Sequence, residues 1–360
     1  MHNVHLHGRA DIRRILLIKW SALGDVIIST AILEDLHQAF PDAIIDLNIL
    51  PPWDRLFRQD TRVNNLLDID LRGKDKGWKG IWKWLQTVRK AKYDLVIDLQ
   101  TNDRSRFLIS ALRLLSPVRP ILMGNRRCFP YHLSPPWTSK PIEVAALDQF
   151  RQTLAAGGIQ TSTPRPVLQI PEDNRKRAAQ LLKDRGLIHN RFAAFIPGCQ
   201  AAGHLKRWGT DNYVALARQL HEAGLEKILL VGGKDEIKDC EDIAAACGEW
   251  VVNLCAKTEI FDLVPIFEQA RFIVGNDTGP THLASCTERP IVVICGPTDP
   301  RRVKPAGDNV RAIQADLPCI NCYQKECDHH SCMKAISPEM VFEMVKSELE
   351  NNRGDSRKHQ

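Results

Sequence analysis

The stretch FIVGNDTGPTHLASCTERPIVVICGP, residues 272–297, decides the fold. Short apolar runs rich in β-branched residues occupy 272–274 and 291–294, and each is bounded by glycine or proline, as is typical of buried strands in a parallel sheet. A polar turn and a short helix, predicted over residues 281–286, lie between the two runs. The stretch therefore predicts a strand, a turn, a helix and a second strand, the repeating unit of an α/β fold.

The turn in this stretch carries side chains that suit a ligand site. In such a unit the turn lies at the carboxyl edge of the sheet, where the start of the next helix favours an anion. Thr278 and Gly279 are small enough for a phosphate to approach the backbone, and Asp277 and His282 can hydrogen-bond polar ligand atoms. Asp, Thr, Gly and Pro also suit an ordinary turn, so this stretch alone leaves both interpretations open.

Length and composition indicate a globular protein of two domains. A chain of 360 residues usually divides into two domains, and 44% hydrophobic with 26% charged residues is typical of a large buried core. No apolar run reaches the roughly 18 residues of a membrane span, and the polar start lacks a signal-peptide pattern. We therefore expect a cytoplasmic protein.

The charge is distributed unevenly along the chain. Residues 1–165 contain 24 Lys and Arg against 16 Asp and Glu, whereas the remainder contains 25 against 27. A basic first half favours an anionic acceptor or an anionic membrane surface as its partner. No signature of a nucleic-acid-binding module occurs, so nucleic acid is not expected as a partner.

A proline-bearing segment, IQTSTPRPVLQIPE at residues 159–172, separates two series of alternating strand and helix patterns. It is typical of an inter-domain linker. We predict two Rossmann-like, doubly wound domains over residues 1–165 and 166–348, facing a central cleft, and a disordered tail over 349–360.

The first domain places charged residues in loops after its predicted strands. Asp25 lies at the amino end of a helix predicted over residues 26–40, where an Asp is ordinarily a cap. Arg104 and Arg106 follow the strand predicted over 93–99, and Arg126 follows further along the chain. These arginines are candidates for binding an anionic substrate, with solvated surface charge as the alternative.

The segment 72–92 carries eight Lys or Arg and one Asp. Apolar residues at helical spacing predict one buried face, made by Trp78, Ile81, Trp82, Leu85 and Val88. We favour a helix that covers the sheet with this face inward. The alternative is a helix that lies in a membrane interface, and Trp84, outside the stripe, supports it.

Four of the eleven cysteines gather in the segment 319–332: Cys319, Cys322, Cys327 and Cys332. A chain without a secretion signal is expected to keep its thiols reduced. The Cys-x-x-Cys pair followed by two further cysteines resembles a zinc knuckle, so a structural zinc site is one interpretation and incidental thiols are the other. Catalysis at this cluster is the weakest interpretation.

Five motifs in order identify a family. They are KWSALGDV at 19–26, YDLVIDLQ at 93–100, PG…KRW at 197–208, NDTGPTHLA at 276–284 and CGPTDP at 295–300. Together they resemble the ADP-heptose:lipopolysaccharide heptosyltransferases, inverting enzymes of the glycosyltransferase-B fold, from residue 15 to about residue 345. The family usually has Lys-x-Ser-Ser-x-Gly-Asp at the first motif, and here Ala22 stands at the second Ser.

The resemblance implies roles for particular residues. Asp25 matches the general base that activates the acceptor hydroxyl, and Lys206 matches the lysine that neutralises the donor diphosphate. The remaining donor-binding residues implied are Arg207, Glu236, Asp277, Thr278, Gly279 and His282, and for Arg207 an outward salt bridge is the alternative.

The resemblance also implies a reaction and its partners. A heptose passes from ADP-heptose to the Kdo or heptose of a lipid A precursor, no cofactor is required for catalysis, and the enzyme contacts the cytoplasmic face of the inner membrane. One alternative is another nucleotide-sugar donor or glycan acceptor, and a second is a non-catalytic, zinc-stabilised nucleotide-binding module. A dinucleotide oxidoreductase is disfavoured because no Gly-x-Gly-x-x-Gly follows the first strand.

Overall fold

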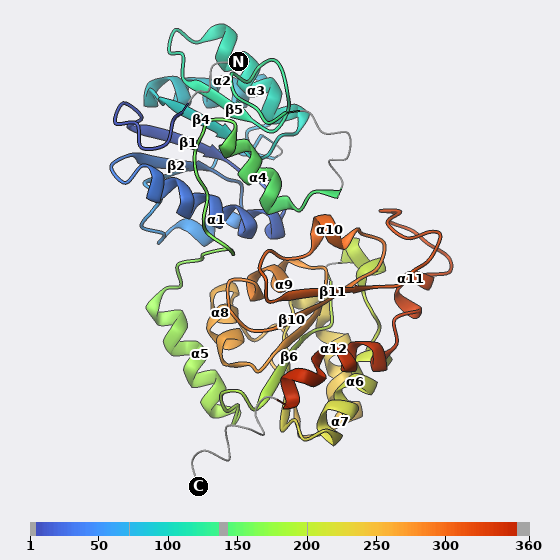
Figure 1. Cartoon of the computed structure of the whole chain (residues 1–360). Helices are drawn as coiled ribbons and strands as arrows, with labels where there is room; N and C mark the ends of the chain where they lie inside the picture. The colour runs from blue at the N-terminus through green and yellow to red at the C-terminus, as the bar shows by residue number, and fades with distance from the viewer. Residues whose placement is uncertain (1–4, 72, 137–142, 200, 351–360) are drawn as a thin grey trace. The chain divides into compact units, whose positions relative to one another are not determined.

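The computed structural model of the chain describes residues 5–71, 73–136, 143–199 and 201–350 (Figure 1). The chain divides into two compact units, residues 1–169 and 170–360. The predicted linker, 159–172, spans this division, and each unit is described by itself. The cleft expected between the domains stays a prediction.

The first unit is a three-layer α/β domain. Its strands pair in parallel in the order β3-β2-β1-β4-β5. They are β1 (Arg14–Ile18), β2 (Ile44–Asn48), β3 (Asn65–Leu67), β4 (Leu95–Asp98) and β5 (Ile121–Gly124). The helices are α1 (Leu23–Ala39), η1 (Trp53–Phe57), α2 (Trp78–Ala91), α3 (Asp103–Leu115) and α4 (Ala146–Ala155). Helices α1 and α4 pack together on one face of the sheet, and α2 and α3 cover the other (Figure 1).

The second unit repeats this plan with six parallel strands in the order β11-β10-β9-β6-β7-β8. They are β6 (Phe192–Ile196), β7 (Lys227–Leu230), β8 (Val251–Asn253), β9 (Ile273–Asn276), β10 (Ile291–Cys295) and β11 (Val310–Gln314). The helices are α5 (Glu172–Asp184), η3 (Ala201–Lys206), α6 (Thr210–Glu222), η4 (Lys234–Glu236), α7 (Ile237–Cys247), α8 (Ile260–Gln269), α9 (Gly279–Ala284), α10 (Pro300–Val303), α11 (Ser331–Lys334) and α12 (Pro338–Glu350). Helices α5 and α8 pack on each other, as do α6, α7 and α12 (Figure 1).

The unit predicted from residues 272–297 is confirmed. Strands β9 and β10 are fully buried parallel neighbours, with Ile273 paired to Ile291, and α9 connects them. Elements begin and end near the predicted residues. Helix α1 begins three residues earlier than predicted, so that Asp25 lies inside its first turn.

The prediction for the Trp-rich helix is confirmed in part: the helix joins the core of the unit through Leu85 and Val88, but Trp78 and Trp82 are exposed. Helix α2 buries Trp84 completely, whereas Trp78 is 73% exposed. Two apolar stripes overlap on this helix, and the deciding contact is distant in sequence: Trp84 Nε1 donates a hydrogen bond of 2.9 Å to Asn48 Oδ1. This bond satisfies the indole N–H inside the core, which allows the largest side chain to be buried.

At the carboxyl end, α12 continues to Glu350, two residues into the segment predicted to be disordered. The rest of that segment, 351–360, lies outside the described residues. None of the helices that the structure describes is long and apolar enough to cross a bilayer.

Candidate active site

The loops after β6, β7, β9 and β10 share one edge of the second sheet, because all its strands run parallel. These loops carry most of the residues predicted to bind a donor. In doubly wound sheets, ligands bind outside this carboxyl edge. Backbone topology therefore brings Lys206 and Asp277, 71 positions apart in the sequence, to one place.

A buried ion pair joins the β6 and β9 loops. Lys206 Nζ donates to Asp277 Oδ2 over 2.6 Å and to the Asp277 carbonyl oxygen over 3.3 Å. Thr298, in the loop after β10, donates its hydroxyl to the same Oδ2 over 2.9 Å. The Asp277 side chain is 5% exposed and that of Lys206 is 30% exposed, so the ammonium reaches the surface while its partner does not.

The Asp277 carboxyl group is deprotonated over the ordinary pH range. Burial by itself raises the pKa of this carboxyl, but the neighbouring His282 imidazole and the Lys206 ammonium outweigh it and lower the pKa to about 2. Asp277 is therefore a fixed negative charge at neutral pH. It orients the Lys206 ammonium at the sheet edge.

His282 offers an unsatisfied polar atom at the same place. Its Nε2 lies 3.9 Å from Asp277 Oδ1, and its buried Nδ1 has no hydrogen-bond partner among the described residues. A buried polar atom without a partner costs about 1–3 kcal/mol, so it is the kind of group that a bound ligand satisfies. Thr278 precedes α9 with an extended backbone and no side-chain cap, and Gly279 opens that helix.

Glu236 lies in the loop after β7, at the same edge of the sheet. Its Oε2 accepts a hydrogen bond of 2.5 Å from the Gly233 N–H, and the residue is buried. A Cβ placed on Gly198 would lie 1.6 Å from Glu236 Cγ. Only glycine therefore lets the β6 loop pass this carboxylate.

Arg207 forms hydrogen bonds within the protein. Its guanidinium donates to the Cys199 carbonyl oxygen over 2.7 Å and to Asp239 Oδ2 over 2.9 Å. These bonds fasten the β6 loop to α7. The salt bridge that was the alternative for Arg207 is therefore present, and its assistance to the donor stays a prediction.

The Cys-rich segment fastens the same loops from outside the sheet. His330 Nε2 hydrogen-bonds the carbonyl oxygen of Leu205 over 2.7 Å, next to Lys206. The indole of Trp208 donates to the Ile336 carbonyl oxygen over 2.7 Å, and the Tyr323 N–H donates to the Pro297 carbonyl oxygen over 2.9 Å. Sequence patterns do not indicate these contacts, because their partners are far apart along the chain.

The zinc interpretation of this segment stays a prediction. Cys319 and Cys322 are exposed, Cys327 is half-buried and Cys332 is buried. Across the residues that the structure describes, no group of three or more His, Cys, Asp or Glu is placed to hold a metal ion. As placed, the four cysteines do not form a tetrahedral cage.

In the first unit, Asp25 projects from the first turn of α1 with 47% of its side chain exposed. Its Oδ2 accepts a 2.9 Å hydrogen bond from Lys19 Nζ, which is almost wholly buried. The N-cap residue is Ala22, and it makes no side-chain cap, so Asp25 is not the cap. Gln100 Oε1 accepts the Trp20 N–H over 2.9 Å, so the β1 and β4 loops are neighbours.

The three candidate arginines lie on α3 and in the loop after β5. Arg106 donates to the Phe129 carbonyl oxygen over 3.0 Å, and Arg126 pairs with Asp103 over 3.1 Å. Arg104 is exposed, and no side-chain partner is found for it in the described part of the chain. The three arginines therefore place cations at the carboxyl edge of the first sheet, and their binding of an acceptor stays a prediction.

Solved structures define the class of fold. The glycosyl transferase family 9 protein from Veillonella parvula has a TM-score of 0.80 and 22% identity, and the match covers 95% of this chain and 99% of that one. The Escherichia coli ADP-heptose lipopolysaccharide heptosyltransferase II has a TM-score of 0.71 and 22% identity, with 94% and 99% covered. The fold is that of the glycosyltransferase-B enzymes.

Sequence comparison defines the family within this class. The sequence profile of glycosyltransferase family 9 (heptosyltransferase) matches residues 81–333. Lipooligosaccharide heptosyltransferase 2 from Haemophilus influenzae is 26% identical over 347 residues, which span 92% of this chain and 98% of that protein. The chain belongs to glycosyltransferase family 9, and it is a glycosyltransferase.

Proposed function

We propose that this glycosyltransferase moves a heptose from ADP-heptose to the Kdo or heptose of the inner core of a lipopolysaccharide precursor, with inversion at the anomeric carbon. Membership of the heptosyltransferase family and the printed functions of its relatives support the donor and the acceptor. The observation that carries the proposal is the Lys206–Asp277 pair, a preorganised cation at the ligand-binding edge of a doubly wound domain.

The reaction needs one displacement. Asp25 takes the proton of the acceptor hydroxyl as its oxygen attacks the anomeric carbon, and the bond from that carbon to the diphosphate oxygen breaks. ADP leaves with the bonding electron pair, and Lys206 balances the negative charge that builds on the diphosphate. The exposure of Asp25 suits it to meet a substrate, whereas Asp277 is buried and acts by holding Lys206.

The acceptor and its location follow from its charge. A precursor with Kdo carboxylates and lipid A phosphates is strongly anionic, and Arg104, Arg106 and Arg126 lie on the edge of the first sheet that also carries Asp25. Because such an acceptor is anchored in a bilayer, the enzyme contacts the cytoplasmic face of the inner membrane peripherally.

Calorimetric titration with ADP, UDP and NAD tests the donor site. We expect ADP to bind the wild type and Lys206→Ala to weaken binding at least about tenfold, because the diphosphate loses its cation. Lys238→Ala is the matched control, since Lys238 is an exposed lysine of the same unit paired with Asp242. Preference for UDP would show that the donor is a UDP-sugar and that the protein is still a glycosyltransferase. Failure to bind any nucleotide would overturn the proposal.

A further inference from the structure

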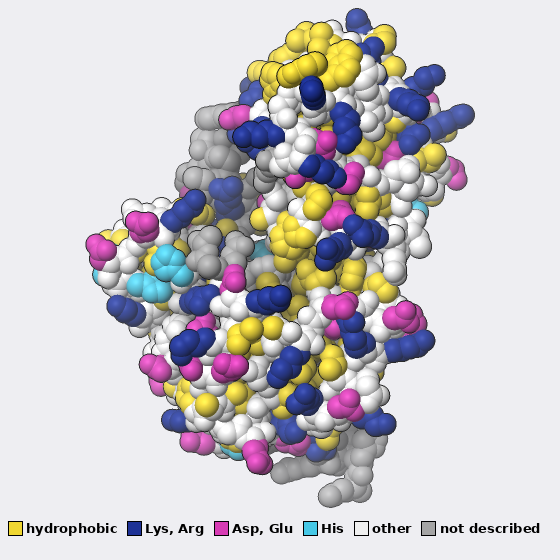
Figure 2. All heavy atoms as spheres, turned by 180° about the vertical axis from the view of Figure 1, so that it is seen from behind, with side chains coloured by type: hydrophobic (Ala, Val, Ile, Leu, Met, Phe, Trp, Pro, Cys, Tyr) yellow, Lys and Arg dark blue, Asp and Glu magenta, His cyan; other side chains and the backbone are white. Residues whose placement is uncertain are grey.

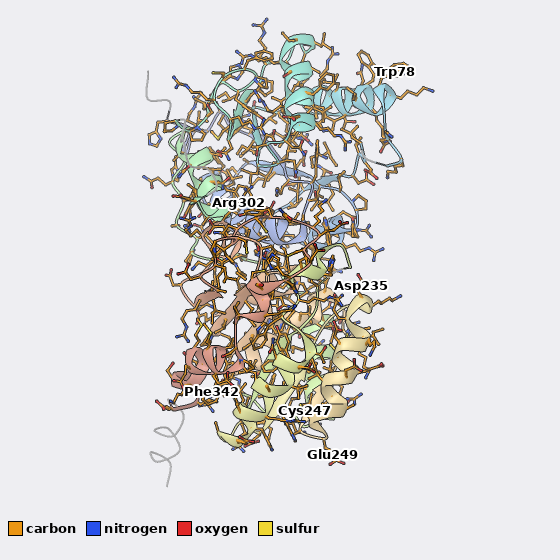
Figure 3. All side chains as sticks on the ribbon, turned by 90° about the vertical axis from the view of Figure 1, so that its right-hand side faces the viewer. Trp78, Asp235, Cys247, Glu249, Arg302 and Phe342 are labelled. Atoms are coloured by element: carbon orange, nitrogen blue, oxygen red, sulfur yellow. The ribbon has the colours of Figure 1, made fainter. Side chains whose placement is uncertain are left out.

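Exposed apolar side chains are concentrated on one face of the first unit. Eleven large hydrophobic residues of the described chain are exposed, and six of them belong to α2, α3 or the loop after β5: Trp78, Trp82, Phe107, Leu114, Leu115 and Phe129. We name this set the α2–α3 face. Figure 2 shows hydrophobic side chains ringed by Lys and Arg at the end where Figure 1 labels α2 and α3, and Figure 3 shows Trp78 pointing away from α2.

The packing of the two helices explains why these residues point outward. The inner sides of α2 and α3 join one core cluster through Trp84, Leu85, Leu108 and Leu112. Trp78 and Trp82 are four residues apart on α2, and Phe107 and Leu114 are seven apart on α3, so each pair shares one outer side of its helix. Each helix therefore has a second apolar stripe that the core does not use.

Cations accompany these stripes. Lys79, Lys83 and Lys90 are exposed on α2, and the Arg113 guanidinium lies 5.2 Å from the centre of the Phe129 ring. Indole rings suit the boundary between acyl chains and headgroups, and lysine chains of this length place their ammonium groups among lipid phosphates. Protein interfaces, by contrast, are depleted in lysine.

We propose that the α2–α3 face docks onto the surface of an anionic lipid bilayer, with the aromatic side chains entering the interface and the lysines contacting headgroups. The inference rests on the proposed function, because it specifies how the enzyme reaches a lipid-anchored acceptor. Helices of such a unit run back from the carboxyl edge of the sheet, so Trp78 and Phe107, near the amino ends of α2 and α3, lie toward the edge that carries Asp25. Docking therefore holds the acceptor loops at the height of the headgroups.

Flotation of the full chain with vesicles tests the face directly. We expect the wild type to float with vesicles of phosphatidylcholine and phosphatidylglycerol at low salt, less at high salt, and little with phosphatidylcholine alone. Trp78→Ser with Trp82→Ser should lower the constant for partition of the protein from water onto the vesicles roughly tenfold. The control, Ile188→Ser with Met340→Ser, removes two exposed apolar residues of the second unit and should bind as wild type.

Activity on two acceptors separates this inference from the proposed function. On a soluble acceptor fragment without acyl chains, the Trp78→Ser, Trp82→Ser variant should transfer heptose as the wild type does, whereas on acceptor embedded in vesicles it should be slower. Absence of transfer to the soluble fragment by the wild type would overturn the proposed function alone. Vesicle binding that is unchanged by the double substitution would overturn the docking surface, as would a wild-type dimer in sedimentation velocity that the same substitution dissociates.

Discussion

Asp25 and Asp277 lie at the carboxyl edges of the two parallel sheets and have opposite environments. Each follows a central strand of a parallel sheet, lies at the start of a helix and pairs with a lysine. Asp25 is about half exposed and its lysine is buried, whereas Asp277 is buried and its lysine reaches the surface. In the proposed mechanism, the substrate therefore meets the carboxylate of the first pair and the ammonium of the second.

The difference teaches that topology places a charged residue but its burial decides its role. An exposed carboxylate can exchange protons with a bound hydroxyl. A buried carboxylate with a strongly lowered pKa stays charged and serves as a fixed partner. The predictions below test this division of roles.

The largest effect is expected for Asp25→Asn. The amide cannot take the acceptor proton, so kcat should fall by a factor of about 10²–10⁴. Affinity for ADP, measured by calorimetry, should not change, because the donor loops belong to the other unit. Asp11→Asn removes another exposed, paired carboxylate of the first unit and is the control; full turnover by Asp25→Asn would break the comparison.

Asp277→Asn should act first on stability. The substitution leaves the partly buried Lys206 ammonium without its counter-charge, and we expect the free energy of unfolding to fall by about 2 kcal/mol, since Lys206 keeps some solvent contact. Urea denaturation measures this change. Thr298→Val, which removes only the hydroxyl donor to the same carboxylate, should cost less.

The same carboxylate predicts a dependence of stability on pH. The pKa of Asp277 falls from an ordinary 3.8 to about 2 on folding. Its contribution is therefore complete above the unfolded pKa and is lost as pH falls through the folded pKa, a change of roughly 2 kcal/mol between about pH 5 and pH 2. Urea denaturation at successive pH values should show a steeper loss for wild type than for Asp277→Asn, and equal slopes would contradict the assignment.

A smaller effect is expected at His330. Loss of its hydrogen bond to the Leu205 carbonyl frees the segment that carries Lys206, so His330→Ala should weaken ADP binding by about threefold to tenfold. His330→Gln keeps a side-chain donor and should restore most of the affinity. His329, whose ring bonds the nearby Ser331 and no other residue in the described ranges, provides the matched control as His329→Ala. Equal affinity for all variants would show that the segment does not position Lys206.

Strand and turn patterns in the sequence predict the β9–β10 unit and the meeting of two loops at its edge. The β9 and β10 strands and the turn between them follow from residues within one stretch, and the meeting of the Lys206 and Asp277 loops follows from parallel topology. Thr298, in the motif CGPTDP, donates its hydroxyl to Asp277, and its position after β10 places it at the same edge of the sheet. That signal was available in the sequence.

Other features depend on contacts that sequence patterns do not contain. His330 and Leu205 are 125 residues apart, so no spacing rule relates them. Leu85 and Val88 of α2 are buried as predicted, but the burial of Trp84 depends on Asn48, which lies on β2 and satisfies the indole N–H. The sequence does not decide whether Arg207 forms a salt bridge, because its partner Asp239 lies on another element, helix α7.

The most direct test of the account is the transfer reaction itself. Wild-type enzyme is mixed with ADP-heptose and a soluble inner-core acceptor, and the product is examined by mass spectrometry and by NMR of its anomeric proton. The account predicts an acceptor heavier by one heptose, an inverted anomeric configuration and release of ADP. Transfer from a UDP-sugar with no product from ADP-heptose would contradict it, and so would a product from ADP-heptose that retains the anomeric configuration.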